Sequence, residues 1–358
     1  MANQQDSSSH PYQKQPDRAF WKRAVKDIYP LEIEAWYKKK FSISGKRLAT
    51  GGSCFAQHIG RELKKQHYTV LDVEPAPSFL NPERHVDYGY GIYSARYGNI
   101  YTSRQLLQLI QRALGEFEPA EQAWALNDRF VDPFRPHVEP YGLESKEEVD
   151  DMRRYHLKQV GSLFEQTDVF VFTLGMTETW MSISDGAVFP VAPGTAGGRF
   201  DNAECKFLNL TYLEIVDDME AVIARLRSVN GNVHFILTVS PVSIMATGGG
   251  EHVVVANTYS KSILRAVAGY LADKYEFIDY FPGYEIITSP PMRSMFYNCD
   301  MRTVASSGVA NVMKQFIEQH APVLGGQRKV LVGTGSAADA SEKVLCDEEL
   351  ASGFGQFI

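Results

Sequence analysis

The stretch "LATGGSCFAQHIGRELKKQ", residues 48–66, joins a short apolar run to an amphipathic segment through two glycines. Glycine at 51 and 52 permits a sharp turn and a close approach of the backbone. A helix that begins near residue 54 would aim its free N–H groups and the positive end of its dipole back at Ser53. This arrangement favours an activated hydroxyl or an oxyanion, although a serine at this place also commonly caps a helix.

Strand-like apolar runs alternate with helical patterns around this stretch. The predicted strands are 47–52, 68–73, 168–175, 232–240 and 276–281. The predicted helices are 54–66, 103–115, 145–165, 211–229, 257–274 and 307–319. The alternation predicts a three-layer α/β/α sandwich with a mostly parallel five-stranded sheet. Because ligands of such sheets bind beyond the carboxyl ends of the strands, we expect the chemistry just after Gly52, Leu174, Val239 and Phe281.

Three segments depart from the alternation. Residues 1–18 are polar, and we expect them to be disordered ahead of a domain that spans 19–322. Residues 76–144 follow the second strand, are too long for a simple crossover and are rich in tyrosine and glycine. They predict an insertion that serves as a lid or substrate wall. Residues 323–358 are rich in glycine, alanine and serine, and we expect a tail outside the core.

The composition excludes several classes of protein. The 358 residues carry a net charge of −7, which argues against a general nucleic-acid or anionic-membrane binder. No run approaches the ~18 apolar residues of a membrane span, and the N-terminal region lacks the apolar core of a secretory signal. The four cysteines are scattered without metal-type spacing. We therefore expect a cytoplasmic protein with reduced thiols, no metal or cofactor, and no nucleic-acid or membrane partner; the pattern makes no prediction of oligomeric state.

Seven motifs between about residues 50 and 285 together resemble the GSCFA-domain family. They are "GSCFAQHIG", "YGNIYTSRQLLQL", "DPFRP", "FTLGMTETW", "TVSPV", "YSKSILRA" and "YFPGYE". That family is similar to the GDSL/SGNH hydrolases, which have a flavodoxin-like α/β/α fold. Those hydrolases act as esterases, lipases and carbohydrate O-acyl esterases or acyltransferases.

The resemblance implies roles for particular residues. Ser53, after two glycines, occupies the place of the nucleophile in G-D-S, although the acid that normally precedes it is absent. Gly98 matches the glycine whose N–H lines the oxyanion hole, and Asn99 beside it offers a side-chain amide. The Ser53 backbone N–H would be a further donor. In the G-x-N-D block Thr177 replaces the asparagine and Glu178 the acid; the loss of one oxyanion donor typically costs ~10²–10³ in rate.

The general base is the largest departure from the pattern. In the D-x-x-H block, Asp300 is followed by Thr303 where the histidine should be. A serine hydroxyl needs a base to become nucleophilic. Of the nine histidines, His252 follows the loop that leaves the fourth strand, at the predicted functional edge, and we predict it to be the base. Glu178 or Asp300 would orient it or act directly as a weak base, and a solvated loop histidine is the alternative.

Other histidines and several substrate-binding residues are also candidates. His85 and His137 lie in the insertion and can face the pocket. Arg135 in "DPFRP" either binds a substrate carboxylate or phosphate or pairs with Asp132. Three aromatic side chains, Tyr93, Tyr97 and Trp180, either stack on a sugar ring or simply pack in the core.

The leading hypothesis is a serine esterase or O-acyltransferase that acts on an acylated, carbohydrate-like small molecule or glycan. The second is a non-catalytic binding or scaffold protein of the same fold, which Thr177 and Thr303 favour. The third makes Cys54 the nucleophile, because the first turn of a helix lowers the pKa of a thiol; buried packing is the commoner fate of such a cysteine.

Overall fold

The computed structural model describes residues 10–321 together with 323–324, 327–328, 344, 346, 347 and 349. A parallel sheet of five strands lies at its centre, in the order β10-β9-β5-β1-β2. The strands are β1 (Arg47–Gly52), β2 (Thr69–Val70), β5 (Val169–Leu174), β9 (His234–Val239) and β10 (Ile278–Tyr280). Taken in chain order this is the 2-1-3-4-5 arrangement of flavodoxin. The predicted sheet is confirmed.

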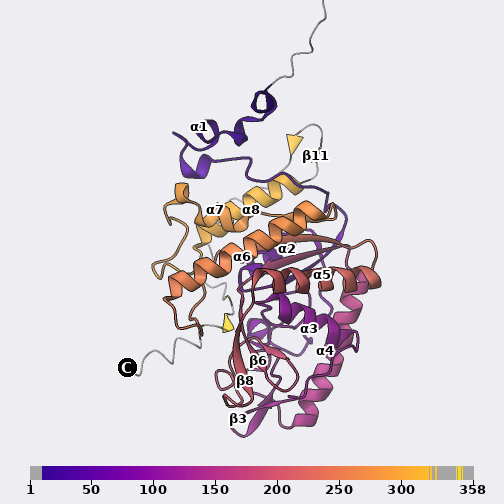
Figure 1. Ribbon diagram of the computed structural model, residues 1–358. Coiled ribbons are helices and arrows are strands. Elements are labelled where there is room, and N and C mark those ends of the chain that lie inside the picture. Colours follow the sequence, from indigo (N-terminus) through magenta and orange to yellow (C-terminus); the bar gives the residue numbers. More distant parts are fainter. Residues whose placement is uncertain are drawn as a thin grey trace, which may run out of the picture.

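Helices cover both faces of the sheet (Figure 1). One layer contains α3 (Ser103–Ala113), α4 (Lys146–Gln166), α5 (Tyr212–Val229) and α6 (Val253–Lys274). The other contains α2 (Phe55–Lys65), α7 (Gly283–Thr288) and α8 (Ser306–His320). Successive side chains of a strand point to opposite faces. Phe170 and Phe172 of β5 accordingly pack under the first layer. Val169 and Val171 pack under the second, which confirms the three-layer sandwich.

Most helix boundaries agree with the pattern, but α6 begins four residues before the predicted start at residue 257. His252 is its N-cap residue, and Nδ1 of His252 accepts a hydrogen bond from the Val254 N–H at 3.2 Å. Val254 and Val255 in the first turn are exposed, so they do not belong to the buried face whose period marks the rest of the helix.

The insertion at 76–144 is built mostly from short elements. It contains the 3-10 turns η4 (Pro82–Arg84) and η5 (Val86–Tyr88), the helix α3, and a hairpin of β3 (Trp124–Leu126) with β4 (Arg129–Val131). The hairpin packs on an antiparallel sheet that the sequence pattern did not predict. That sheet has the order β7-β6-β8 and contains β6 (Glu178–Ser182), β7 (Val188–Phe189) and β8 (Cys205–Asn209). It lies at the end of the molecule opposite α1 (Figure 1).

The described residues ahead of β1 form short turns and one short helix. Exposed short turns η1 (Pro11–Lys14) and η2 (Asp17–Ala19) occupy the described part of the segment expected to be disordered, and residues 1–9 lie outside the described residues. The helix α1 (Trp21–Ala24) and the turn η3 (Pro30–Glu32) follow, and η6 (Pro290–Met292) precedes α8. None of the helices in the described part of the chain is long and apolar enough to cross a membrane.

Residues 323–358 were expected to form a tail outside the core, and most of them lie outside the described residues. The described ones include a small antiparallel pair, β11 (Val323–Leu324) with β12 (Gln327–Arg328). They also include Asp347, which is only 7% exposed and contacts the domain. The expectation of a tail outside the core therefore does not hold for Asp347.

Candidate functional site

The turn at the end of β1 depends on glycine. Gly52 has a φ of +131°, and a Cβ at this position would lie 2.4 Å from the carbonyl oxygen of Thr173. The next N–H, that of Ser53, donates to the same oxygen at 3.1 Å. The Ser53 backbone N–H is therefore engaged in the sheet, which corrects the expectation that it would serve as an oxyanion donor.

The Ser53 hydroxyl is buried and has no hydrogen-bond partner among the described residues. It does not cap α2, which contradicts the capping interpretation. It opens instead into a cavity of about 10 Å³, roughly enough for one water molecule. The cavity is lined by Ser53, Cys54, Tyr101, Gly175, Ser240, Val242, Ile244 and Lys261. A buried, unpaired hydroxyl costs ~1–3 kcal/mol, so this one needs an explanation other than stability.

The turn after β5 is held tightly against Ser53. A Cβ at Gly175 would lie 2.9 Å from the Ser53 Cβ and 2.9 Å from the Tyr101 carbonyl oxygen. The Gly175 N–H donates to that oxygen at 3.0 Å. From α6, the buried Nζ of Lys261 donates to the Gly175 carbonyl oxygen at 2.5 Å. These contacts bring a lysine amine to the Ser53 cavity, a residue that the sequence pattern did not single out.

Asn99 belongs to a buried network that reaches the Ser53 carbonyl oxygen through Tyr93. Its Oδ1 accepts from Tyr93 Oη at 2.6 Å and from Gln57 Nε2 at 3.2 Å. The Tyr93 hydroxyl also lies 3.1 Å from the Ser53 carbonyl oxygen. Asn99 Nδ2 donates to Asp347 Oδ2 at 3.0 Å, so the predicted oxyanion donor holds a carboxylate in this structure. Gly98, which precedes it, has a φ of +69° that favours glycine.

Asp347 links the network to His137 of the insertion. Asp347 Oδ1 lies 2.9 Å from His137 Nδ1, and the Asp347 N–H donates to Tyr101 Oη at 3.0 Å. The His137 Nε2 is shielded from solvent and has no partner among the described residues. Burial alone would lower the pKa of His137, but the Asp347 carboxylate outweighs it and raises that pKa. The sequence pattern had no signal for Asp347, which lies in a stretch without periodicity.

His252 lies on the exposed N-terminal end of α6, where it caps the helix. Lys261, which lines the Ser53 cavity, is about 13 Å further along the helix at 1.5 Å per residue. Because the Ser53 hydroxyl has no described partner, His252 as its base stays a prediction. Asp300, expected to orient the base, is exposed and accepts from the Thr303 hydroxyl at 2.7 Å.

The two residues of the third block are engaged in other contacts. The Thr177 hydroxyl donates to Asn209 Oδ1 at 2.6 Å, so it is not free to donate to an oxyanion. Glu178 accepts from the Thr247 hydroxyl at 2.8 Å and from the Gly248 N–H at 3.2 Å. Burial raises the pKa of the Glu178 carboxyl. Glu178 thus fastens the loop that leads to His252, without a described contact to that histidine.

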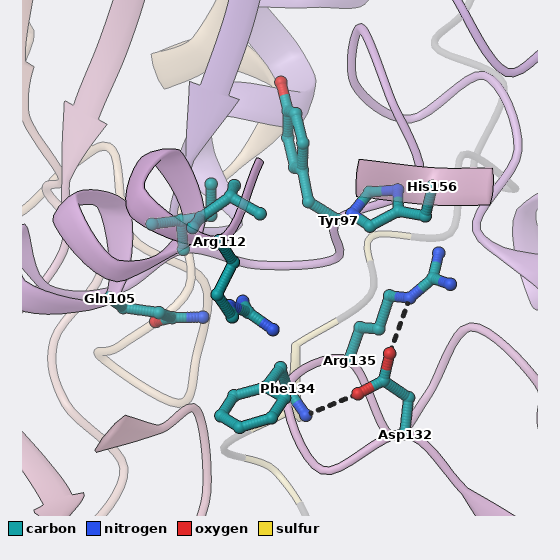
Figure 2. Close-up of a pocket in the computed structure, with 9 residues that line it drawn as sticks. Tyr97, Gln105, Arg112, Asp132, Phe134, Arg135 and His156 are labelled. Carbon is teal, nitrogen blue, oxygen red and sulfur yellow. Dashed lines mark hydrogen bonds and ion pairs between the residues drawn. The ribbon is translucent and has the colours of Figure 1, made fainter. Parts of the chain in front are cut away.

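Arg135 lies in a buried ion cluster (Figure 2). Its Nε is 3.1 Å from Asp132 Oδ2, and its remaining nitrogens donate to the carbonyl oxygens of Arg96 and Met152. Arg153 also pairs with Asp132, and these arginines hold the pKa of the Asp132 carboxyl far below its usual range despite burial. The pairing of Arg135 with Asp132, one of the two alternatives, is the contact observed.

Tyr97 and Trp180, both candidates for stacking on a sugar ring, differ in their surroundings. Tyr97 is buried, and its hydroxyl donates to the Thr50 carbonyl oxygen, as expected of a packed core residue. Trp180 is half-buried and lines a second cavity of about 450 Å³. The apolar walls of that cavity include Met176, Trp180, Pro190, Val191, Phe207 and Met245. Met176 and Met245 directly follow Gly175 and Ile244 of the Ser53 cavity, and Asp347 also lines the larger cavity.

Residues 47–316 match the family model described as the GSCFA family. The chain belongs to the GSCFA family. The match includes the elbow at Ser53, Asn99, His137 and Lys261, whereas Asp347 lies beyond its end. No curated protein matches the chain. For this GSCFA protein, the kinship with SGNH hydrolases stays a prediction from the motifs.

Proposed function

We propose that this GSCFA-family protein transfers acyl groups, with Ser53 as the nucleophile. The observation that carries the proposal is the buried Ser53 hydroxyl, which has no described partner and follows a turn that only glycine can adopt. The N-terminal end of α2 adjoins it and favours developing negative charge. A nucleophile must have no competing partner that holds its oxygen away from the acyl carbon, and most buried hydroxyls are paired.

The reaction balances in two steps. In the first, Ser53 Oγ bonds to the acyl carbon, its proton passes to a base, and the ester C–O bond breaks to release the alcohol, which takes up that proton. In the second, water or an acceptor hydroxyl attacks the acyl-serine and restores Ser53. The Gly98 N–H is the oxyanion donor retained from the motif, whereas the Ala56 and Gln57 N–H groups in the first turn of α2 already donate to the carbonyl oxygens of Ser53 and Cys54.

The second cavity supports an ester with an apolar acyl group. Its volume of about 450 Å³ lies within the ~300–1,000 Å³ typical of ligand pockets. Its walls are largely apolar, and two of its residues are the direct neighbours in sequence of residues around Ser53. Trp180 in the same wall offers a flat surface for a sugar ring, so a carbohydrate-like acceptor or leaving group stays part of the proposal.

A fluorophosphonate probe tests the proposal, because it reacts covalently with activated serines. We expect the wild-type protein to be labelled at Ser53, Cys54→Ala to be labelled as well, and Ser53→Ala to remain unlabelled. Hydrolysis of a p-nitrophenyl ester that is retained in Ser53→Ala and lost in Cys54→Ala would transfer the role to the thiol.

A non-catalytic binding protein is the second candidate. It is favoured by two predicted oxyanion donors that are engaged elsewhere, Thr177 with Asn209 and Asn99 with Asp347. A folded wild-type protein that no fluorophosphonate labels and that hydrolyses no p-nitrophenyl ester would support this candidate and exclude the acyl-transfer proposal.

A further inference from the structure

We propose that His137, held by Asp347, is the general base for Ser53. The inference rests on the proposed acyl-transfer function and assigns the base that the motif comparison leaves vacant at Thr303. It joins a histidine of the insertion to an aspartate near the C-terminus, beyond the residues that match the family.

The contact between His137 and Asp347 has the polarity that a histidine base requires. Asp347 Oδ1 lies 2.9 Å from Nδ1 of His137, and the aspartate is buried. A carboxylate at Nδ1 keeps the proton on that nitrogen, so that Nε2 carries the lone pair that accepts a proton. In this structure both ring nitrogens are shielded from solvent and make no hydrogen bond with the described residues; Asp347 lies at ion-pair distance from Nδ1, and no described group faces Nε2 at such a distance. The nitrogen that would act as the base is thus available.

A chain of polar contacts leads from Asp347 to the backbone of Ser53. Asp347 Oδ2 accepts from Asn99, and Asn99 accepts from the Tyr93 hydroxyl. That hydroxyl lies 3.1 Å from the Ser53 carbonyl oxygen. A second link runs through Tyr101, which lines the Ser53 cavity and whose hydroxyl accepts from the Asp347 N–H at 3.0 Å. Asn99 and Tyr101 therefore act as positioning residues for the carboxylate.

Four titratable or charged groups of the described residues lie near His137 in space or in sequence. Asp347 and Cys346 both raise its pKa, against the lowering effect of burial, and the net shift is upward. Arg135 and Glu139, two positions away on either side, pair with Asp132 and Arg96 respectively. A base with a raised pKa is neutral only at higher pH, so the reaction of Ser53 should accelerate as pH rises through that pKa.

In the proposed step the Ser53 Oγ–H bond breaks as Oγ bonds to the acyl carbon, and the proton moves to His137 Nε2. The same nitrogen then returns the proton to the departing alcohol. The competing interpretation of the same contacts is inhibitory. Because Asn99 Nδ2 holds the Asp347 carboxylate, that carboxylate would occupy an oxyanion position and block the site.

The rate of fluorophosphonate labelling of Ser53, measured from pH 5 to 9 in the full-length protein, separates these possibilities. We expect His137→Gln to lower the rate at pH 7 by at least ~10². Asp347→Asn should lower the rate too. It should also move the acidic side of the pH–rate profile to lower pH, because the carboxylate that raises the His137 pKa is lost while the burial that lowers this pKa remains. The matched control is Glu349→Gln, an exposed carboxylate of the same segment, which should leave the profile unchanged.

Each alternative has its own outcome. Equal labelling of His137→Gln and wild type overturns the proposal. A loss in His252→Gln or in Lys261→Met, with His137→Gln unaffected, moves the role to that residue. Faster labelling of Asp347→Asn shows that the carboxylate blocks the site. If His137→Gln does not fold, the pH–rate profile of Asp347→Asn decides alone. A profile whose acidic side lies at the same pH as in the wild type overturns the proposal. An unlabelled wild type instead refutes the proposed function, and the base assignment with it.

Discussion

The backbone at Gly52 has a φ of +131°, and a Cβ there would lie 2.4 Å from the Thr173 carbonyl oxygen and 2.7 Å from the Thr173 nitrogen. Both contacts are with backbone atoms of the neighbouring strand, which cannot move without breaking the pairing of β1 with β5. The elbow that presents Ser53 therefore depends on the close approach of two strands at one glycine.

Gly52→Ala should lower the free energy of unfolding by more than ~3 kcal/mol, because backbone strain of ~1–3 kcal/mol is added to the clash. The control is Gly91→Ala, at φ +70° with no atom within 4 Å of the added Cβ. That change should cost only ~1–2 kcal/mol. Urea unfolding of both variants checks the difference, and equal losses would show that the clash with Thr173 is relieved by relaxation.

Ser53 itself should cost stability rather than provide it. In Ser53→Ala an unpaired buried hydroxyl disappears, so we expect the melting temperature to stay equal or to rise. Ser260→Ala is the contrasting variant, because the buried Ser260 hydroxyl accepts from the Thr177 N–H at 3.0 Å. It should lose ~1–3 kcal/mol by leaving that N–H unpaired. A marked fall in stability for Ser53→Ala would contradict an unpaired hydroxyl.

At the scale of elements, the loops beyond the carboxyl ends of the strands are held by side chains from other elements. Glu178 at the start of β6 fastens Thr247 and Gly248 of the loop after β9. Ser260 and Lys261 of α6 fasten the turn after β5. Lys261 lines the Ser53 cavity, and Glu178, Thr247 and Gly248 line the larger one, so the shape of the candidate site depends on contacts between elements and not on any one loop.

Glu178→Ala should release the loop at residues 243–251 while the sandwich stays folded. The two hydrogen bonds by which Glu178 holds Thr247 and Gly248 of this loop would be lost. Limited proteolysis should then cut within the loop several times faster than in the wild type, and Glu251→Ala, an exposed carboxylate of the same loop, should not change the rate. Unchanged cleavage in Glu178→Ala would show that the loop is held by its apolar contacts instead.

At the scale of the whole molecule, buried polar clusters connect segments that are distant in sequence. Tyr37 of the N-terminal segment donates to Asp279 Oδ2 of β10 at 2.5 Å, and its hydroxyl lies 3.2 Å from His320 Nε2 at the end of α8. Burial lowers the pKa of His320 to about 3. Burial, together with Arg135, also lowers the pKa of His156 in α4 to about 4. Both histidines are therefore neutral in the folded protein.

Stability should fall as the pH decreases from about 6.5 towards 4. Below its ordinary pKa of ~6.5 a histidine binds a proton in the unfolded chain, whereas in the folded protein His320 stays largely unprotonated down to pH 4 and His156 takes up its proton only as the pH approaches 4. Acid therefore favours unfolding. Urea midpoints at pH 7.5 and 4.5 measure the loss, which should be smaller in His320→Gln and unchanged in His234→Gln. An equal loss in His320→Gln would place the pH dependence elsewhere.

The sandwich could be predicted from the sequence because its signals are local. The continuous apolar run of β5 and the helical period of α5 each reflect burial within one short segment. The glycine pair before Ser53 marked the elbow for the same reason. The antiparallel sheet of β6, β7 and β8 was missed because its strands are two to five residues long and are stabilised by packing against a distant hairpin.

The sequence by itself determined the layers, the order of the elements and the position of the serine, since strand and helix patterns are written in neighbouring residues. Only the tertiary structure decided the surroundings of that serine. It paired Arg135 with Asp132, engaged Thr177 with Asn209, and placed His252 on a helix cap. It also brought Asp347 to Asn99 across 248 positions of sequence. Such contacts form because buried polar groups must find partners wherever the fold supplies them, and no local pattern records which partner that will be.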